Sequence, residues 1–230
     1  MMSQLSGGYG PRIAPSPTGG LFWRWVLATT LGEMLGFFAP VLAGVLLIQA
    51  VASLDRPSAA LLTFCVLVAA GSLEGIALGY AQWRVLRSVL PRIGWRAWTG
   101  ATALAAVLAW SLGMLPNAIT DGAGLGATFM VLAWVAVAPL LLLSIGVAQW
   151  FVLRRHLSRA ALWVPANALG WTLGVGATFV GAALINETMP LWMAVSIGVA
   201  SGIAMGFVVG CITGWTLIRM VRGQLAATIE

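Results

Sequence analysis

Residues 124–151 read GLGATFMVLAWVAVAPLLLLSIGVAQWF, and none of them is charged. A helix needs about 20 mainly apolar residues to cross a bilayer, so this stretch is long enough to span one. Its apolar residues are continuous rather than alternating, which excludes a strand of a membrane barrel. Backbone polar groups in lipid must be satisfied within the segment, and we therefore expect a transmembrane helix here.

Five further runs of the same kind flank this stretch, at residues 22–49, 59–83, 98–118, 162–184 and 190–217. Hydrophobic residues make up 60% of the chain and charged residues 8%, whereas soluble domains carry about 25% charged residues. A chain so poor in charge cannot cover a soluble surface, which excludes a soluble enzyme and a nucleic-acid-binding domain. The predicted fold class is all-α, a polytopic membrane protein with six transmembrane helices.

The arginines predict how these helices are oriented. All 12 basic residues are arginine. If the chain crosses the membrane six times, eleven of them fall on one side and only Arg56 falls on the other. Cytoplasmic loops carry the arginine excess of membrane proteins. We therefore expect a protein of the bacterial inner membrane with both chain ends in the cytoplasm. Residues 1–20, rich in Gly, Pro and Ser, are expected to form a disordered cytoplasmic tail, and residues 223–230 a short C-terminal one.

Two nonapeptides near the ends of the second and fourth runs are nearly identical. Residues 79–87 read GYAQWRVLR and residues 146–154 read GVAQWFVLR, which share the pattern G-x-A-Q-W-x-V-L-R. The sixth run ends with a weaker copy, WTLIR at 215–219, in which Gly214 stands where glutamine is expected. The motif predicts a cytoplasmic interface formed by Gln82, Trp83, Arg87, Gln149, Trp150 and Arg154.

The odd-numbered runs also open alike. Each begins with the pattern W-x-x-A-[TN]-x-L-[GA], in which the first residue is Trp25, Trp98 or Trp163. Self-similarity at a fixed spacing indicates a repeated structural unit. We expect a two-helix hairpin used three times, over residues 21–90, 91–158 and 159–222.

With its repeated Gln-Trp-x-x-Leu-Arg, the chain resembles Trp- and Gly-rich six-span membrane proteins of bacteria, and this resemblance covers residues 22–219. It implies kinship but no activity, so no functional residue is assigned from it.

Glycines recur every four residues along two runs. Small residues let helix backbones approach closely in lipid, so such a stripe, or glycine zipper, predicts helix packing. The same stripe could instead form a groove for a lipid tail, a pigment or a partner helix, and we expect the sixth run to be the external one. The glycines concerned are Gly71, Gly75, Gly79, Gly198, Gly202, Gly206, Gly210 and Gly214.

Tryptophans gather at the arginine-bearing ends of the runs, where aromatic belts of membrane proteins sit at the headgroups. The belt expected here consists of Trp23, Trp25, Trp83, Trp95, Trp98, Trp150, Trp163 and Trp215.

Glu33 and Glu74 are the acidic residues within spanning runs. A charge near the bilayer centre costs at least about 2.5 kcal/mol, and such residues normally face the bundle interior. Both lie about 14 Å from the cytoplasmic boundary at 1.5 Å per residue, so the pair could face each other across the first hairpin. Three roles remain open for it: a protonated structural strut, a proton or cation site, or a contact with a partner subunit. Thr29 and Asn167 are possible hydrogen-bonding neighbours.

Chemistry-bearing residues are otherwise scarce. The single histidine, His156, falls in an arginine-rich loop, and Cys65 and Cys211 lie in apolar runs. Because no metal site, phosphate-binding loop or protease motif occurs, we expect no enzyme, and no cofactor is assigned. The leading hypothesis is an accessory or scaffold protein that packs through its glycine faces against lipid or other membrane subunits. The alternative is a small cation or proton transporter or channel that uses Glu33 and Glu74.

Overall fold

The protein is described by a computed structural model over residues 20–123, 126–186 and 188–226. Within these ranges it is all-helical, without a strand. The elements are α1 (Leu21–Ala50), α2 (Arg56–Leu86), α3 (Trp95–Ala123), α4 (Ala127–Leu153), the 3-10 helix η1 (Ala160–Leu162), α5 (Trp163–Leu184) and α6 (Leu191–Ala226). All six α-helices are long and apolar enough to cross a membrane. The predicted all-helical chain with six candidate spans is confirmed.

Several helices run beyond the apolar residues that predicted them. α2 begins at Arg56 with Pro57 in its first turn, where the missing N–H of proline costs nothing. It ends at Leu86 with Arg84 in its last turn, where a cation interacts favourably with the helix dipole. α6 continues to Ala226, so the tail expected from residue 223 begins as helix. The tail expected over residues 1–20 lies outside the described residues except for Gly20.

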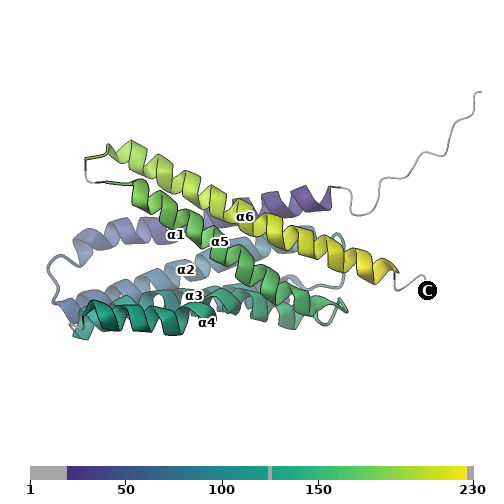
Figure 1. The fold of residues 1–230 in the computed structure, drawn as a ribbon, viewed down its shortest axis with the longest axis horizontal. Helices are drawn as coiled ribbons and strands as arrows, with labels where there is room; N and C mark the ends of the chain where they lie inside the picture. Colours follow the sequence, from purple (N-terminus) through teal and green to yellow (C-terminus); the bar gives the residue numbers. More distant parts are fainter. Residues whose placement is uncertain (1–19, 124–125, 187, 227–230) are drawn as a thin grey trace, which may run out of the picture.

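The six helices form a closed ring. Each packs against its neighbours along the chain, and α6 packs against α1. α1 begins and α6 ends at the same end of the bundle (Figure 1). We call this end the Arg-rich end, because every described arginine except Arg56 lies there.

The core is concentrated toward the Arg-rich end. The larger cluster of buried apolar side chains joins the start of α1 and α3 to the ends of α2, α4 and α6. In α4, buried residues occur only from Ser144 to Leu153. α4 and α5 are the least extensively packed neighbours, and they diverge away from the Arg-rich end (Figure 1). The far half of the ring is therefore the looser half.

Candidate functional site

Glu33 and Glu74 meet inside the ring. Glu33 on α1 is 0% exposed and Glu74 on α2 is 7% exposed. Each carboxyl group acts electrostatically on the other, so the two lie close together. Two glycines make room for them. A Cβ at Gly36 would lie 2.7 Å from the Cα of Glu74, and one at Gly206 would lie 3.1 Å from the Cβ of Glu33.

The two carboxyl groups have unequal partners. The indole Nε1 of Trp110 donates a hydrogen bond to Oε2 of Glu74 at 2.8 Å. Neither oxygen of Glu33 has a donor among the described residues. Two adjacent carboxylates are costly to ionise together, and a proton on Glu33 can be donated to Glu74. If the pair shares one proton, the negative charge is best placed on Glu74, which already accepts a hydrogen bond from Trp110.

Glu74 also lines a cavity of about 440 Å³. All six helices contribute to the cavity wall, which places it inside the ring. Most of the lining is apolar or aromatic, and it includes Trp110, Trp134 and Trp171. Phe179 of α5 lines the cavity and is 68% exposed, so the cavity wall reaches the outer surface of the bundle at α5.

One indole on the cavity wall has no partner. Trp171 is 8% exposed, and its Nε1–H has no hydrogen-bond acceptor among the described residues. Sequence analysis did not single out Trp110, Trp134 or Trp171. The available signal was their position, because they lie in the middle of apolar runs rather than at the ends.

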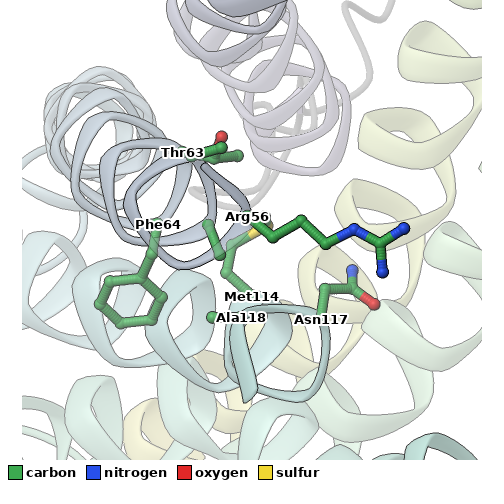
Figure 2. A pocket seen from close by; sticks show the side chains of 8 residues that line it. Arg56, Thr63, Phe64, Met114, Asn117 and Ala118 are labelled. Carbon is green, nitrogen blue, oxygen red and sulfur yellow. The ribbon is translucent and has the colours of Figure 1, made fainter. Parts of the chain in front are cut away.

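A second cavity, of about 420 Å³, lies between the start of α2 and the end of α3. Figure 2 shows Arg56 and Asn117 extending their polar ends to the same side of it. Met114 and Asn117 line both cavities, so the two are adjacent.

Toward the Arg-rich end, three tryptophans fill the centre of the ring. Trp25, Trp98 and Trp163 are each 0% exposed, and their rings pack edge to face with centroids 5.6 to 6.4 Å apart. The expectation that these three belong to an interfacial belt is wrong, because neighbouring helices cover them completely. Trp23, Trp95 and Trp215 remain at least half exposed.

The two motif glutamines lie next to these tryptophans and are buried. Gln149 donates through Nε2 to Oε1 of Gln82 at 3.0 Å and to Oγ1 of Thr102 at 2.9 Å. It accepts a hydrogen bond from Nε1 of Trp163 at 2.9 Å, and Gln82 donates to Thr29 at 3.3 Å. Thr29 therefore belongs to this layer rather than to the glutamate pair.

The tryptophan and arginine of each motif lie nearer the surface. Arg87 lies over the ring of Trp83 with 5.1 Å between guanidinium and centroid, and Arg154 lies over Trp150 at the same distance. The motif therefore splits, with glutamine inside the ring and the Trp–Arg pair at its surface. Asn167, the other expected neighbour of the glutamates, donates instead to the carbonyl oxygen of Trp163.

The weak copy of the motif in the sixth run lies beside Trp25. Nε1 of Trp25 donates to Oγ1 of Thr213 at 2.9 Å, next to Gly214. A Cβ at Gly214 would lie 2.8 Å from Cδ1 of Trp25, which leaves no room for a larger side chain there.

Six of the eight stripe glycines pack within the ring. A Cβ at Gly71, Gly75 or Gly79 would collide with α3, and one at Gly206, Gly210 or Gly214 would collide with α1. At Gly198 and Gly202 a Cβ would meet nothing within 4 Å. The stripe of α6, expected to be external, is thus largely internal, and only these two glycines are open. Cys65 is exposed and Cys211 half-buried.

Comparisons of the chain with protein-family models, with curated proteins and with solved structures return no match.

Proposed function

We propose that this chain is a small transporter of the bacterial inner membrane that moves a proton or another cation on Glu33 and Glu74. The observation that carries the proposal is a buried carboxyl pair at the wall of a cavity to which all six helices contribute. Ionisable residues within spans are costly and typically mark ion pathways. A pair that holds one proton can exchange it for a cation while the net charge of the site stays constant.

The packing at the Arg-rich end favours a transporter over an open channel. Trp25, Trp98 and Trp163 fill the centre of the ring there. Trp25 and Glu33 lie eight residues apart on α1, which corresponds to about 12 Å. In this state the pair is closed off from the Arg-rich end, and transfer requires the tryptophan layer to part. Such alternating closure is how transporters avoid a continuous leak.

The scaffold hypothesis needs a glycine-rich surface that is free to pack against another protein, and little of that surface remains open. It relies on glycine faces that can pack against another protein, and six of the eight glycines are occupied within the ring. Gly198 and Gly202 are the part of the stripe that remains open to a partner. We therefore place the transport role first.

We further infer that the ring is three hairpins related by a repeat. Trp25, Trp98 and Trp163 open the three units and pack together. Gly79, Gly146 and Gly210 each lie against the residue that follows one of these tryptophans: a Cβ would be 3.0 Å from the Cα of Thr99, 3.3 Å from that of Val164 and 3.0 Å from that of Val26. A shared contact at three places supports a common unit.

The orientation that we propose places the Arg-rich end in the cytoplasm. We expect a fluorescent protein fused after residue 90 or 157 to fluoresce and a phosphatase fused there to be inactive, because these positions lie in the cytoplasm. After residue 54, which lies in the periplasm, we expect the phosphatase to be active and the fluorescent protein to be dark. The physical reason is that loops rich in arginine are retained on the cytoplasmic side. Paired phosphatase and fluorescent-protein fusions measure this, and a periplasmic signal at residue 90 would reverse the assignment.

Proton flux tests the transport role. The full chain in liposomes, with a pH-sensitive dye inside and a potassium diffusion potential across the membrane, is expected to take up protons faster than protein-free liposomes. The Glu33→Gln, Glu74→Gln double variant is expected to fall to the protein-free rate, because no carboxyl is left to carry the proton. Asp55→Asn, at an exposed acid near the start of α2, is the matched control and keeps the wild-type rate.

Two results would contradict the proposal. A wild-type rate equal to that of empty liposomes removes the transport role. A rate that survives in the double variant removes the carboxyl mechanism.

A further inference from the structure

The cavity beside Glu74 holds polar groups that the chain leaves without partners. Both oxygens of Glu33 lack a donor, and Nε1–H of Trp171 lacks an acceptor, although both side chains are more than nine-tenths buried. Trp171 and Glu74 line the cavity directly, and Glu33 lies behind Glu74. Buried polar groups without a partner are rare, because each costs about 1–3 kcal/mol. The oxygens of Glu33 can therefore accept N–H donors that the chain does not supply, whereas the Nε1–H of Trp171 is itself a donor and takes no part in holding a cation.

The lining defines the charge and shape of that group. The pair with one proton carries a negative charge, so the complementary ligand is a cation that brings N–H donors. The walls add the aromatic faces of Phe37, Trp110, Trp134 and Trp171. Aromatic faces attract cations and bury apolar groups. A volume of about 440 Å³ lies in the range of roughly 300–1,000 Å³ that is typical of small-ligand sites.

A metal ion fits this site less well than an organic cation. No group of three or more His, Cys, Asp or Glu side chains that could hold a metal occurs within the described ranges. Trp110 also directs an N–H donor at Glu74, a position that a coordinated metal would need. Magnesium and calcium usually bind six or more oxygen atoms, many more than the pair offers.

The cavity opening indicates where the ligand enters. Phe179, which lines the cavity and is exposed, lies within the apolar part of α5, and α4 and α5 are the least extensively packed neighbours of the ring. The adjacent cavity is lined by Arg56, which repels cations. A ligand that reaches Glu74 from the bilayer must be largely hydrophobic.

The geometry points to a hydrophobic protonated amine as the ligand of this cavity, with its N–H held by Glu74 and Glu33. This inference rests on the proposed transport role and names its substrate class. On binding, the cation R3NH⁺ enters and the shared proton leaves to solvent, so the site keeps one net negative charge before and after. The exchange of one amine for one proton is therefore electroneutral at the site.

The other charged side chains of the described helices lie near the helix ends. Besides each other, the groups that act on the two carboxyls include the indole of Trp110. The arginines of the helices packed around the pair lie within two turns of a helix end, and Tyr80 and Cys65 are exposed. These arginines are Arg24, Arg56, Arg84, Arg96, Arg219 and Arg222. The proton released on binding therefore comes from Glu33 and Glu74.

Calorimetry on the full chain in lipid nanodiscs tests the inference, with empty nanodiscs as the blank. The probes share a naphthylmethyl group and carry a dimethylamine, a trimethylammonium or a carboxylate. We expect the dimethylamine to bind at least about tenfold more tightly than the trimethylammonium, because only the former donates an N–H to a carboxylate. The carboxylate probe is expected not to bind. Titration in two buffers of different ionisation enthalpy is expected to report one proton released per amine bound.

Two variants test the carboxyl and the volume of the amine site. Glu74→Gln is expected to abolish amine binding and proton release together. Gly113→Leu narrows the cavity at its α3 wall, where the nearest atom to a Cβ is Cδ1 of Leu141 at 3.3 Å. We expect it to weaken amine binding at least tenfold. Asp55→Asn serves again as the control, and size-exclusion chromatography verifies folding of each variant.

Each alternative outcome has a definite reading. Equal binding of all three probes indicates an apolar cavity without charge recognition and overturns the inference. Equal binding of the amine and the trimethylammonium, or binding without proton release, overturns it as well. Proton flux without amine binding overturns the inference and leaves the transport role intact. Amine binding with proton release, but with neither potential-driven proton flux nor amine-driven loss of protons from the liposomes, leaves the site intact and overturns the transport role.

Discussion

Replacement of Gln149 by leucine is expected to lower the free energy of unfolding by about 2–4 kcal/mol, because it leaves two buried groups without partners. Nε1 of Trp163 loses its acceptor and Oε1 of Gln82 loses its donor. Each group is enclosed by protein and cannot turn to water. Single hydrogen bonds between membrane helices average only about 0.6 kcal/mol, so the cost of two orphaned groups decides the size of the effect.

The difference in the free energy of unfolding between Gln149→Leu and the wild type is measured by unfolding in sodium dodecyl sulfate, with circular dichroism as the signal. Gln49→Leu is the matched control, because Gln49 lies on α1 and is exposed, and we expect it to change the stability by less than about 0.5 kcal/mol. A double-mutant cycle with Gln82→Leu isolates the contact between the two amides. If Gln149→Leu costs no more than Gln49→Leu, the buried hydrogen-bond layer does not stabilise the ring.

Substitution of Gly210 by valine is expected to destabilise the ring by about 1–3 kcal/mol, the usual cost of overpacking. A Cβ at Gly210 would lie 3.0 Å from the Cα and 3.2 Å from the carbonyl oxygen of Val26. These are backbone atoms, so the clash cannot be relieved by a change of rotamer, and α6 must move away from α1. Closure of the ring depends on this contact, since α6 and α1 are its two ends.

Gly202→Val on the same helix is the matched control. A Cβ at this position meets nothing within 4 Å, and valine has a higher helix propensity than glycine. We therefore expect the control to be neutral or slightly stabilising, so that the two variants differ in sign. The detergent unfolding assay measures both, and equal effects would show that α6 does not pack tightly on α1.

Only part of the candidate site could be predicted from the sequence. Glu33 and Glu74 stand out because charge within an apolar run is costly, and that rule needs no structure. Trp110 lies 36 residues from Glu74 in sequence, and its hydrogen bond depends on how α3 packs on α2. Trp171 comes from α5, and its place at the cavity depends on the closure of the ring.

The number of spanning helices is fixed by local chemistry, and the sequence alone determined it. Each backbone group in lipid must find its partner within four residues along its own helix, so apolar length suffices to predict six helices. Which side chains face inward depends on the neighbours instead. Trp23 and Trp25 are both tryptophans near the start of α1, yet one is 57% exposed and the other 0%. Trp25 is covered by residues far away in sequence, including Trp98, Trp163 and Thr213, and only the tertiary structure brings these into contact.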